Sequence, residues 1–232
     1  MNTMFAKRLL DLLAPRCCCG CGARLALTEQ YVCTSCLLSV PRTGFASDPY
    51  ENPMARLYYG RLPVERAAAW AFYSPDNVSS RMVKTLKYHG LPALGDLLGR
   101  IMGAELQKHH FFDGIDVLMP IPLAPTRLHE RGYNQSRHIA QGLSLATGIP
   151  IADGVVVRTE FKGSQTRLAH ADRQKNVDDV FLLKAPDAVA GSHVLIVDDV
   201  VTTGATTMSF GRELLKINDV KASILALTFT KD

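Results

Sequence analysis

The sequence VLIVDDVVTTGATT, at residues 194–207, decides the fold. Four apolar residues precede two adjacent acids, Asp198 and Asp199, which is typical of a buried strand that ends in polar side chains. Because ligands bind beyond the carboxyl ends of the strands in an open parallel sheet, we expect both carboxylates at a ligand site. Two adjacent buried carboxylates repel each other, so they favour a ligand that brings hydroxyl groups or a bound metal ion.

The residues after the acids suit a phosphate group. They comprise Val201, Thr202, Thr203, Gly204, Ala205 and Thr206. These residues lead into a predicted helix, whose first N–H groups and dipole favour an anion. The glycine permits a tight turn, and the threonine hydroxyls are additional donors. The acids and the loop together match the diol and the phosphate of a ribose 5-phosphate. A solvated Asp-Asp turn would explain the acids, but it would not explain the loop.

Strands alternate with helices along the rest of the chain. We expect strands at 66–73, 116–122, 154–157, 193–199 and 221–230. We expect helices at 75–88, 92–108, 133–148 and 205–217, the first capped by Ser74 with Pro75 in its first turn. This alternation predicts an α/β fold with a mostly parallel sheet and helices on both faces.

Composition excludes several classes of protein. The 232 residues are 47% hydrophobic and 21% charged, as in ordinary globular proteins. The net charge of +4 is too small to indicate nucleic-acid or membrane binding by itself. No apolar run is long enough to span a bilayer. The apolar residues near the N-terminus have helical spacing, which predicts a short amphipathic helix rather than a signal peptide and therefore a cytoplasmic protein.

All six cysteines lie between residues 17 and 36. Cys18 and Cys21 form one C-x-x-C pair and Cys33 and Cys36 form another, a spacing that allows four thiolates to surround a structural zinc ion. The alternatives are a redox motif or unligated thiols. Cys17 and Cys19 are surplus, and Cys17 can replace Cys18 as a ligand. We expect a zinc ribbon with the amphipathic helix at 1–45, a linker at 46–65 and the sheet domain at 66–232.

The stretch VLIVDDVVTTGAT resembles the phosphoribosyl-pyrophosphate motif of type I phosphoribosyltransferases. A narrower resemblance covers residues 17–207: the cysteine pairs, LKYHG (86–90), MPIPLAPTRLHERGYNQS (119–136) and RQKNVDDVF (173–181) occur in the order seen in the ComF family. These are competence-associated, phosphoribosyltransferase-like proteins with an N-terminal zinc ribbon. The resemblance implies a type I phosphoribosyltransferase-like fold and binding of phosphoribosyl pyrophosphate with Mg²⁺.

The resemblance also implies roles for individual residues. Asp198 and Asp199 would hold the ribose hydroxyls during displacement of pyrophosphate, and residues 201–206 would hold the 5-phosphate. Arg127 and Arg131 would grip pyrophosphate, because a guanidinium binds phosphate oxygens in a bidentate way. Lys87 matches a family position. Each of these basic residues can instead be an exposed surface residue.

The polar segment 158–177 matches the mobile loop that closes over substrate in phosphoribosyltransferases. Arg158 and Gln165 fit the family pattern in this segment, but Lys162 stands where a threonine is expected. A plain surface loop is the alternative.

Three functions follow from these features. The chain can be a phosphoribosyltransferase linked to DNA uptake, with an acceptor that the sequence does not identify. It can be a non-catalytic phosphoribosyl sensor or adaptor, whose ribbon contacts single-stranded DNA or a DNA-uptake ATPase. It can also be a metabolic salvage enzyme. Family membership alone does not decide between them.

Overall fold

The computed structural model describes residues 15–159 and 180–230. Its centre is a four-stranded sheet in the order β1-β6-β5-β2, in which every neighbouring pair is parallel. The strands are β1 (Ala67–Tyr73), β2 (Val117–Pro120), β5 (His193–Val201) and β6 (Lys221–Thr230). The apolar side chains of β5 and β6 are buried on both faces, as expected for a parallel sheet between two layers of helices. The predicted α/β class is therefore confirmed.

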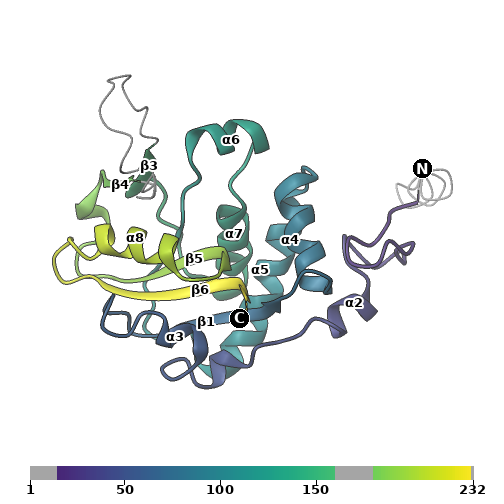
Figure 1. Ribbon diagram of the computed structural model, residues 1–232, viewed down its shortest axis with the longest axis horizontal. Coiled ribbons are helices and arrows are strands. Elements are labelled where there is room, and N and C mark those ends of the chain that lie inside the picture. The colour runs from purple at the N-terminus through teal and green to yellow at the C-terminus, as the bar shows by residue number, and fades with distance from the viewer. Residues whose placement is uncertain (1–14, 160–179, 231–232) are drawn as a thin grey trace, which may run out of the picture.

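Helices cover both faces of this sheet (Figure 1). One layer contains α4 (Val78–Tyr88), α5 (Pro92–Leu106) and α7 (Gln135–Thr147). The other contains α3 (Pro53–Arg56) and α8 (Ala205–Leu214). Right-handed crossovers place the helices after β1 and β2 on one face and α8 on the other, because the chain reverses direction across the sheet before β5. The shorter helices are α2 (Thr34–Leu38), α6 (Pro125–Arg131), η1 (Phe45–Ser47), η2 (Gln107–His109) and η3 (Pro186–Ala188).

A second, two-stranded sheet pairs β3 (Val156–Thr159) with β4 (Val180–Leu183) in antiparallel orientation. The sequence predicted a strand close to β3 but missed β4, which follows a long polar segment without periodicity. Phe181 anchors this small sheet to α8 through an edge-to-face contact with Phe210, with ring centroids 5.3 Å apart. Residues 160–177 of the expected mobile loop, including Lys162 and Gln165, lie outside the described residues, as does the predicted N-terminal amphipathic helix, whereas Arg158 and Thr159 form the end of β3.

The start of α4 differs from the prediction. Asn77, rather than Ser74, caps the helix, and its side chain accepts a hydrogen bond from the Ser80 N–H at 2.8 Å. The Asn77 N–H donates to the Ser74 carbonyl at 3.2 Å, so the Ser-Pro pair forms a turn before the helix. Proline was a reasonable signal for a first turn, but the asparagine two residues later supplies the better cap.

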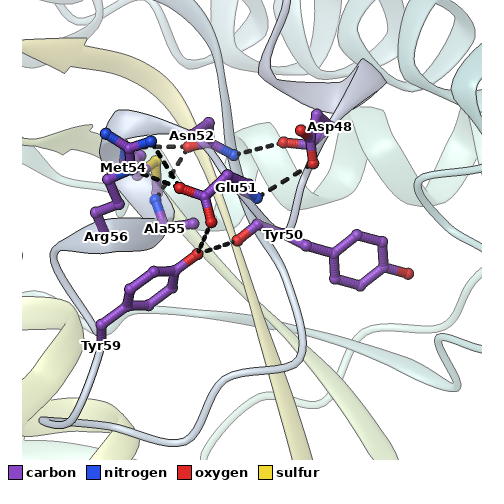
Figure 2. A network of polar contacts seen from close by, with 8 residues as sticks. All are labelled: Asp48, Tyr50, Glu51, Asn52, Met54, Ala55, Arg56 and Tyr59. Atoms are coloured by element: carbon purple, nitrogen blue, oxygen red, sulfur yellow. Dashed lines mark hydrogen bonds and ion pairs between the residues drawn. The ribbon is translucent and has the colours of Figure 1, made fainter.

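Residues 46–65, expected to be a linker, pack against the sheet domain. Met54, Tyr58 and Leu62 are buried in the core. Asn52 begins α3 by accepting hydrogen bonds from the N–H groups of its first turn. Figure 2 shows how Glu51 joins Arg56 and Tyr59 in a polar network around this turn, while the ring of Tyr50 points away from the network. The segment therefore belongs to the packed structure, although it lacks a periodic apolar pattern.

Helices α5 and α7 approach each other through glycines. A Cβ atom at Gly99 would lie 2.1 Å from the Ile139 carbonyl oxygen, and a Cβ at Gly142 would lie 2.1 Å from that of Asp96. Only glycine allows two backbones to approach this closely. This contact fixes the position of α7, whose first residues face the carboxyl end of β5. None of the described helices combines the length and the apolarity that a membrane span needs.

Candidate functional site

The two acids are buried together at β5. Asp198 is 8% exposed and Asp199 is 7% exposed. Lys87, from the last turn of α4, places its Nζ 3.1 Å from Asp199 Oδ2. The start of α7 supplies two partners: Gln135 Nε2 donates to Asp199 Oδ2 at 3.0 Å and Ser136 Oγ donates to Asp198 Oδ1 at 3.2 Å. The Asp199 backbone N–H also donates to Asp198 Oδ1, at 2.8 Å. We call Asp198 and Asp199 the acid pair.

The electrostatics of the acid pair favour an incoming ligand. Burial and the neighbouring Asp199 charge raise the pKa of Asp198 to about 7, although Lys87 and the hydrogen bonds to its carboxylate act in the opposite direction. Asp198 is thus held in an environment that disfavours its own negative charge. Hydroxyl donors or a cation bound beside it would relieve this penalty. β5 continues two residues beyond the acids to Val201, so the acids lie inside the strand rather than at its last residue.

Residues 201–206 follow the acid pair closely in the sequence, and we call them the phosphate loop. Together with Asp198 they line a small cavity of about 60 Å³. Gly204 has a φ of 74° and precedes α8, and no side chain caps the first N–H groups of this helix. Thr202 and Thr203 are exposed. Free N–H groups, hydroxyls and the positive end of the helix dipole therefore converge on one small space, which suits a phosphate.

The sequence missed the support beneath this loop. Tyr58 OH and Thr207 Oγ1 share a 2.7 Å hydrogen bond, and Thr207 Oγ1 also donates to the Gly204 carbonyl at 2.8 Å. Burial raises the pKa of Tyr58, so its hydroxyl stays neutral and keeps its proton for hydrogen bonding. No local pattern around Tyr58 indicated this role, because the contact joins residues 149 positions apart.

A second cavity, of about 160 Å³, opens over the acid pair, and we call it the acid cavity. Its lining includes Lys87, Arg127, Arg131, Gln135, Ser136, Arg158, Asp198, Asp199 and Thr206. The structure thus brings the predicted basic residues Lys87, Arg127 and Arg131 into one cavity with the acid pair. Gln135 is 2% exposed and its Oε1 has no hydrogen-bond partner among the described residues. An acceptor without a partner at the wall of a cavity is available to a ligand donor.

Local structure holds the basic wall of the acid cavity in place. Gly132, with a φ of 76°, ends α6, and Asn134 then caps α7 through the Ser136 N–H at 3.1 Å. Asn134 Nδ2 also donates to the Ile121 carbonyl at 2.9 Å. Tyr133 OH donates to the Leu86 carbonyl at 2.5 Å, which ties this turn to the end of α4. Lys87 and Arg131 are therefore positioned by one connected unit.

The four expected metal ligands form a separate site. The Sγ atoms of Cys18, Cys21, Cys33 and Cys36 all lie within 4.8 Å of one another, close enough to hold a metal ion. Burial raises the pKa of the Cys18 thiol, but N–H groups from Cys33, Cys21 and Gly20 outweigh this effect and lower it to about 7. Four thiols with such N–H donors fit a tetrahedral zinc ion. We call residues 17–36 the cysteine module.

The two surplus cysteines lie outside this cluster. Cys17 is exposed, and its Sγ contacts the Pro15 carbonyl at 3.5 Å. Cys19 is half-buried, and burial raises the pKa of its thiol to about 12. The structure therefore favours Cys18 over Cys17 in the ligand set, an alternative that the sequence had left open.

The cysteine module contacts α4 at the end opposite Lys87. Arg81 Nε donates to the Gly20 carbonyl, and a Cβ atom at Gly20 would lie 3.2 Å from Val78 and 2.8 Å from the Cys36 sulfur. Glycine is needed here because the first C-x-x-C turn is pressed between a ligand sulfur and the helix.

Sequence comparisons agree with this geometry. Residues 64–232 match the phosphoribosyl transferase domain family, and the chain therefore belongs to that family. The chain is 29% identical over 215 residues to the DNA utilization protein YhgH of Escherichia coli (strain K12), with 88% of this chain and 93% of the relative covered. The YhgH protein of Salmonella typhi is 28% identical over the same length and coverage.

A third relative supports the narrower resemblance. Competence protein F of Haemophilus influenzae (strain ATCC 51907 / DSM 11121 / KW20 / Rd) is 33% identical over 114 residues, which is 49% of this chain and 50% of that protein. These relatives confirm the ComF-type resemblance. Among solved structures, a purine phosphoribosyltransferase from Pyrococcus horikoshii Ot3 covers 63% of this chain at 15% identity with a TM-score of 0.36, which is too distant for a functional argument.

Proposed function

We propose that this protein binds phosphoribosyl pyrophosphate with Mg²⁺ and transfers its phosphoribosyl group to an acceptor. The observation that carries this proposal is the continuity of the acid pair with the phosphate loop along one strand and the helix that follows it. A ribose 5-phosphate needs hydrogen-bond acceptors for its two hydroxyls and, next to them, a binding site for its phosphate. The family match supports this assignment.

Each part of the site has a role in this reaction. Asp198 and Asp199 accept hydrogen bonds from the ribose hydroxyls and stabilise the positive charge that develops at the anomeric carbon. The N–H groups and hydroxyls of the phosphate loop hold the 5-phosphate. Arg127 and Arg131 bind the pyrophosphate leaving group from the opposite wall of the acid cavity. Bound Mg²⁺ would neutralise charge on the pyrophosphate and ribose oxygens.

Lys87 has a second role before ligand binds. Its ammonium group compensates the charge of Asp199 until ligand arrives. Because it also lines the acid cavity, the same side chain can turn toward a pyrophosphate oxygen.

The names of the relatives suggest a setting for this activity. They are called DNA utilization protein and Competence protein F, so we propose a cytoplasmic role in the uptake or use of DNA. The zinc-bound cysteine module would then be the part that contacts single-stranded DNA or a DNA-uptake ATPase. A sensor that binds phosphoribosyl pyrophosphate without turnover is the second candidate, and the same relatives support it.

Calorimetry with phosphoribosyl pyrophosphate and Mg²⁺ tests the binding assignment. Asp199→Asn should weaken binding about 10- to 100-fold, because a charge-assisted hydrogen bond contributes roughly 1.5–3 kcal/mol. Gly204→Val should abolish binding, because a β-branched residue is strained at a φ of 74°. Asp153→Asn is the matched control, since Asp153 pairs with Arg137 on the surface. Equal affinity in wild type and Asp199→Asn would remove the ribose assignment.

Pyrophosphate release, measured across nucleobase and amine acceptors, separates enzyme from sensor. In an enzyme, Asp199→Asn should lower kcat more than affinity, because the charge at the anomeric carbon exists only in the transition state. Binding without release on every acceptor would favour the sensor.

Asp198→Asn adds a pH-dependent test of the acid pair. Since the folded-state pKa of Asp198 is raised to about 7, wild type loses stability as the pH rises from about 4 to 7. The asparagine variant lacks this loss, so its stability advantage should grow over that range and remain constant above it. Thermal unfolding at pH 5 and pH 8 measures the difference. A constant difference at both pH values would contradict the buried, repelled carboxylate.

A further inference from the structure

Tyr58 is a fully buried residue in the turn after α3, and it precedes residue 64, where the family match begins. Its hydroxyl oxygen lies 2.7 Å from Thr207 Oγ1, which itself donates to the Gly204 carbonyl at 2.8 Å. Because Thr207 uses its single hydroxyl proton in the second bond, Tyr58 is the donor in the first. The two bonds therefore form a chain with one direction, from Tyr58 through Thr207 to the backbone of the phosphate loop.

The Gly204 carbonyl, at the end of this chain, also accepts a hydrogen bond from the Met208 N–H at 2.8 Å. Gly204 has a φ of 74°, and a glycine can leave this conformation at little cost. Because a peptide unit is planar, rotation of the unit after Gly204 would put its carbonyl oxygen where the Ala205 N–H now lies. A carbonyl oxygen repels an anion, so such a rotation would weaken phosphate binding. The two hydrogen bonds to this oxygen oppose the rotation.

Packing holds Tyr58 against the start of α8. A Cβ atom at Gly204 would lie 3.2 Å from Tyr58 Cε1, so the ring is in close contact with the loop. Further along α8, a Cβ atom at Gly211 would lie 2.6 Å from Leu62 Cδ2. The Leu62 N–H donates to the Tyr58 carbonyl at 3.0 Å, which joins the two contacts in one turn. This turn therefore packs against both the beginning and the later part of α8.

The segment that carries Tyr58 is also attached to the central sheet. Asn52, which caps α3, donates through its Nδ2 to the Ala67 carbonyl at the start of β1, at 2.8 Å. Burial raises the pKa of Tyr58, although the hydrogen bond to Thr207 acts in the opposite direction. The Tyr58 hydroxyl is thus fixed in position and keeps the proton that it donates.

We propose that Tyr58 is a positioning residue that sets the affinity of the phosphate loop for the 5-phosphate, an inference that rests on the proposed function. Because Tyr58 is fully buried, it acts on the ligand only through Thr207 and Gly204. It keeps the loop in the conformation that presents N–H groups, rather than a carbonyl oxygen, to the phosphate. The effect is therefore specific for the 5-phosphate and does not extend to pyrophosphate, which the basic wall of the acid cavity binds.

Calorimetry on the full-length protein tests this role with two ligands, ribose 5-phosphate and pyrophosphate with Mg²⁺. Tyr58→Phe keeps the ring but removes the donor, so ribose 5-phosphate should bind about 3- to 10-fold more weakly, as expected for the loss of one hydrogen bond. The affinity for pyrophosphate should stay at the wild-type value. Thr207→Val removes the hydroxyl in the middle of the chain and should have the same selective effect, whereas Thr207→Ser should retain affinity for both ligands.

Tyr59→Phe is the matched control. The Tyr59 hydroxyl donates to the Tyr50 carbonyl and to Glu51 at the surface, so its removal should change neither affinity (Figure 2). The double variant Tyr58→Phe/Thr207→Val tests whether both residues act through one chain. In that case it should bind ribose 5-phosphate no more weakly than the weaker single variant, whereas the fold-losses of independent residues would multiply.

Two calorimetric results would overturn the role of Tyr58. One is equal affinity of wild type and Tyr58→Phe for ribose 5-phosphate, and the other is an equal loss of affinity for both ligands, which would indicate general disruption. Hydrogen exchange of the phosphate-loop amides needs no ligand, and it should be faster in Tyr58→Phe than in wild type and Tyr59→Phe. If wild type fails to bind ribose 5-phosphate, the proposed function fails, whereas unchanged hydrogen exchange in Tyr58→Phe would show that Tyr58 does not hold the loop.

Discussion

The cysteine module and the sheet domain obtain their stability from different sources. In the module, Cys18, Leu25, Val32 and Cys36 are buried, and two of these four residues belong to the thiol cluster. In the sheet domain, most side chains in the interiors of β5 and β6 are apolar and fully buried. The module therefore depends on what its thiols bind, whereas the sheet domain depends on its own packing.

The two regions are nevertheless in contact. Arg42, which follows the module, makes a two-point ion pair with Glu105 of α5, with both N–O distances at 2.8 Å. Trp70 of β1 donates its indole N–H to the same carboxylate at 2.7 Å, and the Arg42 guanidinium lies 3.9 Å above its ring. The two regions therefore differ in what stabilises them, although contacts between them help to fix the position of each.

The largest effect should come from removing the metal. Cys33→Ser removes one of four thiolates, and the metal-binding free energy of such sites, about 10–16 kcal/mol in zinc-finger peptides, also stabilises their fold. We expect wild type to bind one zinc ion per chain and Cys33→Ser to lose it. Hydrogen exchange should then increase across the cysteine module and remain slow in β5 and β6. If hydrogen exchange in the module stays unchanged after the metal is lost, the module does not depend on metal for its stability and the contrast with the sheet domain is wrong.

Cys17→Ser is the control for that experiment. Cys17 is exposed and lies outside the thiol cluster, so this variant should retain zinc. Alkylation of the zinc-bound protein should modify Cys17 faster than Cys19, because Cys17 is exposed and Cys19 is half-buried. Faster modification of Cys19 would reverse the assignment of the two surplus thiols.

A smaller effect should come from the contact between α5 and α7. Gly142→Ala inserts a methyl group 2.1 Å from the Asp96 carbonyl oxygen, so the helices must separate. Overpacking of this kind costs about 1–3 kcal/mol of unfolding free energy. Urea unfolding of the sheet domain measures it, and zinc content should stay at the wild-type value. Gly114→Ala is a useful comparison, since a Cβ atom at Gly114 would have no neighbour within 4 Å, so any cost there reflects its positive φ of 70° rather than overpacking.

The smallest effect concerns the contact between the two regions. Burial raises the pKa of Glu105, but hydrogen bonds from Arg42 and Trp70 outweigh it and hold the pKa below its ordinary value. The stability that this carboxylate contributes is present above its unfolded-state pKa and is lost as the pH falls through its folded-state pKa. Glu105→Gln should therefore cost roughly 0.2–1 kcal/mol at pH 7, since the pair is partly exposed, and should cost less in acid. A cost that is the same at both pH values would show that the charge is unimportant.

Much of the architecture could be predicted from local sequence. The four apolar residues before the acid pair, the glycine that ends α7 and the spacing of the cysteines each reflect a short-range physical constraint. The mostly parallel sheet and the layers of helices on both of its faces followed from the alternation of such signals, whereas the order of the strands within the sheet did not. The start of α4 was placed wrongly because a proline and an asparagine competed as start signals over four residues.

The remaining features depend on contacts between distant parts of the chain. Gln135 and Ser136 contact the acid pair across more than sixty positions, and nothing in their own neighbourhood indicates it. Tyr58 supports the phosphate loop from a segment without periodicity. Such contacts depend on the tertiary arrangement of the sheet and helices, so an analysis of local sequence patterns misses them.

Helix α4 has one further consequence. Its first turns contact Gly20 of the cysteine module, and its last turn presents Lys87 to Asp199. If a partner of the module moves this helix, it changes the affinity of the acid pair for its ligand by some factor. Thermodynamic linkage then requires that ligand to change the affinity of the partner by the same factor. In that case the helix would make occupancy at one end of the protein detectable at the other.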